Sequence, residues 1–172
     1  MSEQFAVIIM GSDSDLPLVK NTLDVLKGFD IKFEVRVASA HRTPDVVSNY
    51  VQDAEQRGAA VFICAAGLAA HLAGAVAART TRPVIGIPVD GGPLNGVDAL
   101  YSTVMMPGGI PVATVAVGKA GAKNAGYLAA QIMALADKDL DNRVKANRQQ
   151  AAQEVMDKDA KLQESLRIYK LN

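Results

Sequence analysis

Five short apolar runs recur along the chain, and each is followed by a polar loop and a stretch with helical periodicity. The runs occupy residues 6–10, 33–37, 61–65, 84–89 and 112–117, and the helical stretches occupy residues 15–29, 44–56, 71–79, 96–105 and 121–136. We interpret the runs as parallel strands buried on both faces, because they lack the alternation of half-exposed strands. Strict alternation of strands and helices predicts an α/β fold, a three-layer doubly wound parallel sheet of the flavodoxin-like type.

The chain changes character after about residue 137, where it becomes rich in charged residues. An apolar stripe continues through this region and includes Leu140, Val144, Ala151, Val155 and Leu162. This pattern predicts one long helix, or two, appended at the carboxyl end. An amphipathic helix needs a surface to bury its stripe. We therefore divide the chain into an α/β domain at residues 1–137 and a helical extension of the same domain at residues 138–172. The extension folds back on its own subunit or, as we expect, packs on a neighbouring one.

Composition and charge narrow the classes of partner. Hydrophobic residues make up 49% of the chain, and 18 Lys and Arg balance 18 Asp and Glu. A balanced charge argues against nucleic-acid binding, which relies on many phosphate contacts from a basic face, and against a polybasic membrane patch. The partner we expect is a small molecule.

Three further features predict a cytoplasmic protein that does not span a membrane. Cys64 is the only cysteine, so an internal disulfide is impossible, and its apolar neighbours predict a buried side chain. The amino terminus does not resemble a secretory signal. Residues 58–78 carry no formal charge, but they are mostly Ala and Gly with His71 among them, which favours a strand, turn and helix over a membrane span.

Candidate chemistry gathers where the predicted strands end. Ligands bind such sheets outside the carboxyl ends of the strands. The loops that begin there are residues 11–15, 38–44, 66–71 and 90–96, and they are rich in small, polar and catalytic residue types. This convergence at one edge of the sheet predicts a binding site.

The first loop, with the sequence GSDSD, combines two hydroxyls and two carboxylates before a helix. Ser12 and Ser14 lie beside the unpaired amides of a helix start, which is a favourable place for an anion. Ser and Asp are also preferred N-caps, worth ~1 kcal/mol each, and Asp15 fits a cap as well as a ligand role. Because a phosphate disfavours nearby carboxylates, we expect at least one to face another group, such as a ribose diol.

The second loop contains the most informative residue, His41, which lies between Ser39 and Arg42. Histidine exchanges protons near neutral pH, and arginine offers a planar fork for phosphate or carboxylate. A solvated surface loop is the alternative interpretation. Thr43 is the expected N-cap of the next helix, with a proline after it. His71, which follows the third strand, fits a direct role and a packing role equally well.

Several familiar chemistries lack their motifs. The chain contains no P-loop, and no dinucleotide fingerprint follows its first strand. One cysteine and two separated histidines do not make a zinc site, and the absence of tryptophan disfavours a flavin pocket. We therefore expect no cofactor and no metal.

Five segments resemble, in order, the signatures of the 5-(carboxyamino)imidazole ribonucleotide mutases, the class I aminoimidazole ribonucleotide carboxylase family. They are residues 10–15, 39–44, 66–72, 96–102 and 106–112, and the resemblance extends over about residues 6–136. It implies an isomerase of purine biosynthesis that moves a carboxylate from the exocyclic nitrogen of an imidazole ribonucleotide to the adjacent ring carbon, without ATP, metal or organic cofactor. It also implies a homo-octamer whose carboxyl-terminal helices pack on neighbouring subunits.

The resemblance also implies roles for individual residues. His41 is the acid–base group, Ser12, Ser39 and Arg42 hold the 5′-phosphate, and Asp15 holds the ribose hydroxyls. The loop with Gly67 lines the pocket that retains carbon dioxide. Secondary roles fall to Ser14 and His71.

The sequence departs from the family pattern in three places and leaves two alternatives open. One departure is the loop at residues 90–95, which is richer in glycine than the family pattern. Ala73 and Met105 stand where the family usually has Pro and Gln. A direct carboxylase of aminoimidazole ribonucleotide is the nearest alternative, although that branch typically has Lys where Arg42 stands. A non-catalytic phosphate- or nucleotide-binding module is the second, although residues 65–66 are both Ala, where a receiver domain would need an acceptor Asp.

Overall fold

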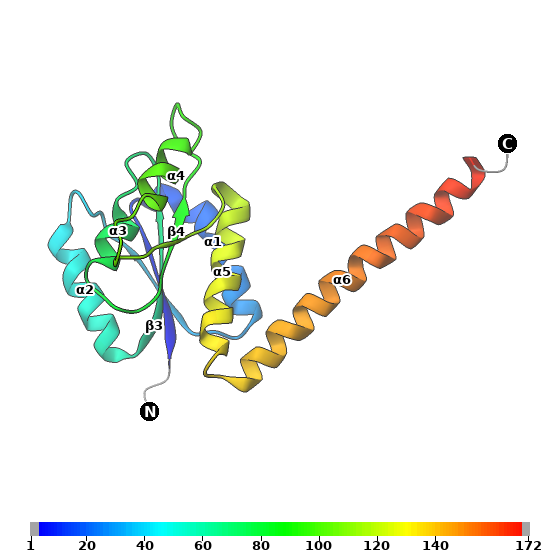
Figure 1. Cartoon of the computed structure of the whole chain (residues 1–172), viewed down its shortest axis with the longest axis horizontal. Helices are drawn as coiled ribbons and strands as arrows, with labels where there is room; N and C mark the ends of the chain where they lie inside the picture. The colour runs from blue at the N-terminus through cyan, green and yellow to red at the C-terminus, as the bar shows by residue number, and fades with distance from the viewer. Residues whose placement is uncertain (1–3, 170–172) are drawn as a thin grey trace. The chain divides into compact units, whose positions relative to one another are not determined.

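The computed structural model describes residues 4–169. The chain forms two compact units, one that ends at Met133 and another that begins at Ala134. Figure 1 draws the first unit as a sheet between helices and the second as a long helix.

A five-stranded parallel sheet forms the centre of the first unit, with the strand order β2-β1-β3-β4-β5. The strands are β1 (Phe5–Met10), β2 (Phe33–Val37), β3 (Ala59–Ala66), β4 (Val84–Pro88) and β5 (Ala113–Thr114). From β1 the chain continues first to β2 on one side and then to β3 on the other. The strand order therefore reverses beside β1, and sheets of this kind bind ligands at such a switch point.

Helices cover both faces of the sheet, which confirms the predicted doubly wound architecture. The helices of this unit are the short 3₁₀ turn η1 (Asp13–Asp15), α1 (Leu16–Gly28), α2 (Pro44–Arg57), α3 (Leu72–Ala77), α4 (Val97–Val104) and α5 (Gly118–Ala134). In Figure 1, α1 and α5 lie on one side of the sheet, and α2 and α3 lie on the other. The Thr22 hydroxyl on α1 donates to the Ala122 carbonyl on α5 at 2.7 Å. Gly126 allows this close approach, because a Cβ there would lie 2.8 Å from Val25 Cβ.

The central strands carry the core. Every residue of β1 is buried, and Val61–Ala65 of β3 are no more than 1% exposed. Cys64 is buried within β3, as predicted, and burial raises the pKa of its thiol. A side chain on either face of β1 or β3 meets a helix, so both strands read as continuous apolar runs.

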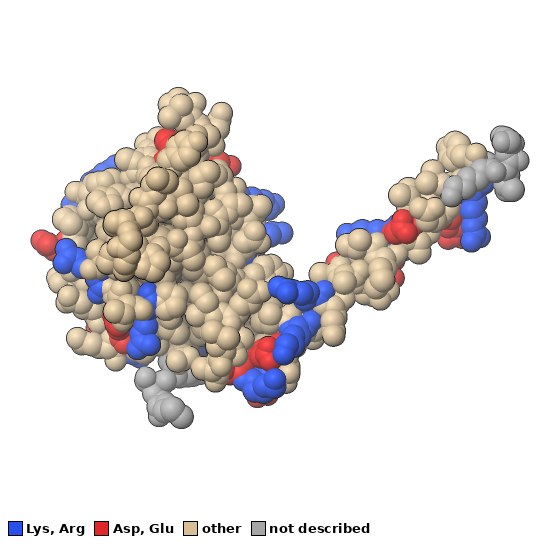
Figure 2. Space-filling model, in the orientation of Figure 1, with Lys and Arg blue, Asp and Glu red and all other residues tan. Residues whose placement is uncertain are grey.

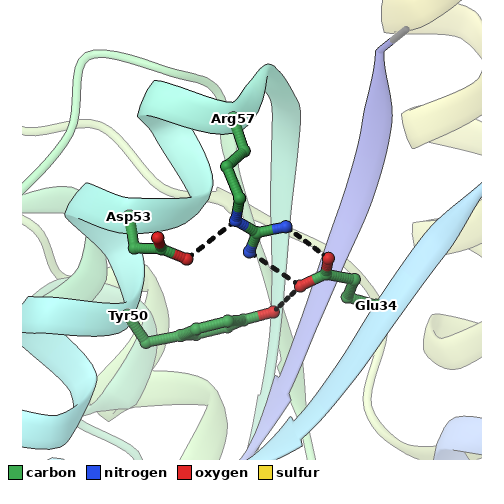
Figure 3. Close-up of polar contacts among 4 residues, drawn as sticks. All are labelled: Glu34, Tyr50, Asp53 and Arg57. Carbon is green, nitrogen blue, oxygen red and sulfur yellow. Dashed lines mark hydrogen bonds and ion pairs between the residues drawn. The ribbon is translucent and has the colours of Figure 1, made fainter.

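The prediction for β2 is wrong in one respect, because the strand is not buried on both faces. It lies at the edge of the sheet, and its residues are partly buried or exposed. Glu34 and Arg36 alternate with apolar residues, which is the pattern of a half-exposed strand. On this surface the Arg57 guanidinium pairs with the carboxylates of Glu34 and Asp53, and the Tyr50 hydroxyl donates to Glu34 at 2.8 Å (Figure 3). These charges suit an edge strand, which must avoid pairing with other chains.

The fifth strand is shorter than predicted, with two residues instead of six. It pairs with β4 through Ile85 and Gly86 and is followed by one more bond, from Val115 N to Gly86 O. The next donor that a parallel ladder would use on β4 is that of Pro88, which has no N–H. The ladder therefore ends at this point.

The second unit is one continuous helix, α6 (Lys138–Leu166), followed by the short turn η2 (Arg167–Tyr169). Asp137 caps it, because its carboxylate accepts from the backbone N–H groups of Asp139 and Leu140 at 3.0 Å. Acidic and basic side chains both occur along the length of α6 (Figure 2). Within residues 4–169, no helix is long and apolar enough to cross a membrane.

Most of the predicted stripe on α6 is not buried. Leu140 is the one buried residue among those described in this helix. Val155 and Leu162 are 64% and 53% exposed. The division of the chain at residue 137 and the packing of this helix on a neighbour stay predictions.

Candidate functional site

Three of the predicted loops start side by side at the carboxyl edge of the sheet, because their strands are neighbours. The Gly11 amide, at the start of the first loop, donates to the Ala65 carbonyl of β3 at 3.1 Å. The Ala38 amide, at the start of the second, donates to the Met10 carbonyl of β1 at 3.0 Å. The sheet thus brings the residues that follow β1, β2 and β3 to one place.

Ser12 organises the first loop as the N-cap of η1, a 3₁₀ turn that precedes α1. Its hydroxyl oxygen accepts from the Ser14 amide at 3.3 Å and from the Ser14 hydroxyl at 2.8 Å. The Ser12 hydroxyl in turn lies 3.3 Å from Asp13 Oδ1. The capping role weighed for this loop therefore belongs to Ser12, and both predicted serines have a structural function here.

Asp15 occupies the N-cap position of α1, but its side chain makes no capping hydrogen bond. Burial is the main cause that raises the pKa of its carboxyl group, and the charge of Asp13 adds to it. A hydrogen bond from the Ser12 backbone acts in the opposite direction. The Asp15 carboxylate is thus partly removed from water without serving as a cap.

The second loop connects β2 to α2 and is closed by its own hydrogen bonds. The Arg42 amide donates to the Ser39 hydroxyl oxygen at 3.1 Å, and the Thr43 amide donates to the Ser39 carbonyl at 2.9 Å. His41 and Arg42 lie within this closed turn, and both are exposed. Thr43 occupies the predicted N-cap position of α2, but its hydroxyl makes no capping bond to the helix.

The two histidines of the chain meet at this edge. The ring centroids of His41 and His71 lie 5.6 Å apart, and the rings are inclined by 48°. His71 occupies the N-cap position of α3 without a side-chain cap bond, and it is exposed. The packing role weighed for His71 is therefore a contact with His41 and not burial in the core.

Gly67 follows β3 directly, at the start of the third loop. A Cβ there would lie 3.5 Å from Val89 Cβ, which is ordinary van der Waals contact, so close packing does not require glycine. The next residue, Leu68, adopts a φ of +56° and is 55% exposed. Leu68 therefore has a left-handed backbone conformation, which residues other than glycine seldom adopt.

A cavity of about 420 Å³ lies between α2 and α3, next to the second loop. Of the predicted site residues, His71 lines it. The remaining lining residues are mostly small or apolar: Ala40, Pro44, Val47, Ser48, Ala75, Ala78 and Arg79. His71 thus contacts His41 and also borders this apolar space.

Sequence reasoning missed the part that the Thr43 hydroxyl plays in closing the second loop. A threonine four residues after Ser39 was the available signal, but it was assigned to the following helix.

Within residues 4–169, no group of three or more His, Cys, Asp or Glu side chains is placed to hold a metal ion.

Comparisons with known proteins agree with this arrangement. The family model described as AIR carboxylase matches residues 6–154. The N5-carboxyaminoimidazole ribonucleotide mutase of Bacillus subtilis is 51% identical over 150 residues, which cover 87% of this chain and 93% of the relative. The protein of the same name from Thermotoga maritima is 49% identical over 157 residues, which cover 91% of each chain.

A solved structure shares the fold over nearly its whole length. The crystal structure of PurE from Treponema denticola has a TM-score of 0.84 and 33% sequence identity, and the match covers 92% of this chain and 98% of that one. The residues that the family model matches include all three loops of the site. The chain therefore belongs to the AIR carboxylase family.

Proposed function

We propose that this protein is a mutase that converts 5-(carboxyamino)imidazole ribonucleotide to 5-amino-4-imidazolecarboxylate ribonucleotide in purine biosynthesis. The observation that carries this proposal is the match to mutases of that name, which are about half identical over most of the chain. The arrangement of the site supports it, because an exposed histidine and arginine follow β2 beside the switch point of the sheet.

His41 is the acid–base group of the proposed reaction. When the bond between the exocyclic nitrogen and the carboxylate breaks, carbon dioxide leaves and His41 gives its proton to that nitrogen. The adjacent ring carbon then attacks carbon dioxide, and His41 removes the proton from that carbon. One histidine thus gives and regains one proton, as a general acid and base must.

The remaining loop residues hold the ribonucleotide. Arg42 is exposed and presents its fork to the 5′-phosphate. The Ser39 hydroxyl accepts from the Arg42 amide, so its own proton remains to donate to a phosphate oxygen. Ser12 offers a second hydroxyl, since a phosphate oxygen can replace its long bond to Asp13. Asp15, which is partly withdrawn from water, accepts hydrogen bonds from the ribose hydroxyls.

Small side chains beside the two histidines suit the retention of carbon dioxide. In our proposal Gly67 and its loop line one wall, and His71 supports His41 through their ring contact. Ala40 and Ala75 line the neighbouring cavity with His71. Water would compete for the freed carbon dioxide, so an apolar wall favours its return to the ring.

We further propose a cytoplasmic homo-octamer. Exposed apolar side chains on α4 and the adjoining loops support an assembly, since such patches mark protein contacts. They include Leu94, Val97, Tyr101, Val104 and Met105, and Met105 is 78% exposed. Sedimentation should then give eight times the 18.1 kDa mass of the chain. Symmetric assemblies of this kind are common among enzymes.

The test of the catalytic proposal offers the purified protein two substrates in parallel. One reaction contains 5-(carboxyamino)imidazole ribonucleotide without ATP, at low bicarbonate, and the other contains aminoimidazole ribonucleotide with bicarbonate. The absorbance of the carboxylated ring product is followed against reactions without protein. Conversion of the first substrate supports the mutase. Activity with the second substrate alone makes the protein a direct carboxylase, and the absence of product in both reactions contradicts the proposal.

A further inference from the structure

The Thr43 hydroxyl closes the turn that carries His41. It accepts from the Ser39 amide at 3.0 Å, and it lies 3.1 Å from the Ser39 carbonyl, to which it donates. The Thr43 amide donates to the same carbonyl at 2.9 Å. Three hydrogen bonds therefore join the two ends of the five-residue turn, and two of them use the side chain.

This hydroxyl does not serve the helix that follows. The side chain makes no capping bond to α2, and the residue has a φ of −137° and a ψ of 53°. The backbone carbonyl of Thr43 starts the helix instead, by accepting from the Val47 amide at 3.2 Å. The hydrogen bonds of the side chain are thus directed entirely into the turn.

The backbone at the two functional residues of the turn is held differently. Arg42 has its own attachment, because its amide donates to the Ser39 hydroxyl oxygen. The His41 side chain is exposed, and its ring contacts the ring of His71. The position of His41 therefore depends on the closure of the turn more than the position of Arg42 does.

We propose that Thr43 is a positioning residue for His41, which acts by joining the two ends of the turn on which His41 stands. This inference rests on the proposed acid–base function of His41. A displacement of about 1 Å in a reacting group can slow catalysis by as much as ~10²-fold. Loss of the two side-chain bonds should therefore lower kcat, whereas Arg42 keeps its attachment and binding should change little.

Thr43→Val tests this directly, because it keeps the shape of the side chain and removes both hydrogen bonds. We expect kcat to fall about tenfold and KM for the ribonucleotide to stay within about twofold of the wild type. Thr43→Ser keeps the hydroxyl and should recover kcat to within about threefold of the wild type. The matched control is Thr80→Val, because the Thr80 hydroxyl also donates to one group, Glu55, and accepts from another, the Arg82 amide.

A second measurement separates this inference from the proposed reaction. The chain has two histidines, so the ring signals of His41 and His71 can be followed by NMR without substrate. Thr43→Val should shift the His41 signals, whereas Thr80→Val should not. Wild-type kcat in Thr43→Val, an equal loss in Thr43→Ser, or unchanged His41 signals would each overturn the inference. Inactive wild-type protein with shifted His41 signals would count against the proposed reaction and still support the role of Thr43.

Discussion

The two units of the chain differ in how far their apolar side chains are buried. In the unit that ends at Met133, all six residues of β1 are buried, and β3 is nearly as well covered. In α6, which has 29 residues, Leu140 is the one buried residue among those described. Val155, Met156 and Leu162 are each more than half exposed. The first unit therefore buries its own core, whereas most of the apolar stripe of α6 is exposed.

Local interactions, not burial, support the conformation of α6. Asp137 caps its start, and Lys145 pairs with Asp141 one turn earlier at 2.8 Å. Water screens such exposed pairs, so each adds little to the stability of the helix. A long helix with exposed apolar residues is suited to a partner, whereas the first unit has the core and the loops that chemistry requires. The two units should therefore respond differently to substitution.

The largest effect should come from the second loop of the first unit, which carries the proposed acid–base residue. His41→Asn removes the proposed proton carrier and should lower kcat by ~10²–10⁴-fold. The ribonucleotide should still bind, since Arg42 and Ser39 are unchanged. Steady-state kinetics on 5-(carboxyamino)imidazole ribonucleotide measure the loss, and turnover near the wild-type rate would show that another group carries the proton.

A substitution in the core should lower stability much more than a substitution on the exposed surface of α6. Phe62 is fully buried in β3, and Phe62→Ala should lower the free energy of unfolding by about 3–5 kcal/mol. Gln149→Ala on the exposed surface of α6 should change it by less than about 0.5 kcal/mol. Urea unfolding followed by circular dichroism compares the two variants, and similar losses in both would contradict the distinction between the units.

Charged substitutions on the apolar stripe should break the proposed octamer without unfolding the chain. Val155→Asp combined with Leu162→Asp places two charges seven residues apart on one helical face and should yield a particle smaller than an octamer. The matched control combines Gln149→Asp with Ala160→Asp, which lie on another face and are also exposed. Sedimentation measures the mass, and an unchanged particle in the first variant would show that this stripe does not form the contact.

The smallest effect should come from the ion pair on the edge strand. Hydrogen bonds from Arg57 hold the pKa of Glu34 at about 2, below its ordinary value of 4.5. Water screens this half-exposed pair, so Glu34→Gln should cost about 1 kcal/mol or less at pH 7.

The pH dependence of that effect follows from the lowered pKa of Glu34. The unfolded chain takes up the proton near pH 4.5, and the folded chain takes it up only near pH 2. The stabilisation is therefore complete above pH 4.5 and is lost as the pH falls towards 2. Urea unfolding of wild type and Glu34→Gln at several pH values should show their difference shrinking in that interval. A constant difference would mean that the charge of Glu34 is not its cause.

Local patterns in the sequence determined the architecture and the candidates for the site. Apolar runs that alternate with helical periodicity were enough to predict parallel strands and helices on both faces, because each element buries a face with its own period. The residues that follow those runs then had to gather at one edge. This is why His41, Arg42 and Ser12 could be named as candidates from the sequence alone.

The tertiary structure decided which groups meet and which surfaces stay open. The position of β2 at the edge of the sheet is what identifies its alternating residues as those of a half-exposed strand. The Thr43 hydroxyl had two possible partners, a helix start or a turn, and the path of the chain between β2 and α2 selected the turn. The contact of His41 with His71 joins loops from two strands that are not neighbours in the sheet. Such choices depend on distances between residues far apart in the sequence, which a local hydrophobic pattern does not contain.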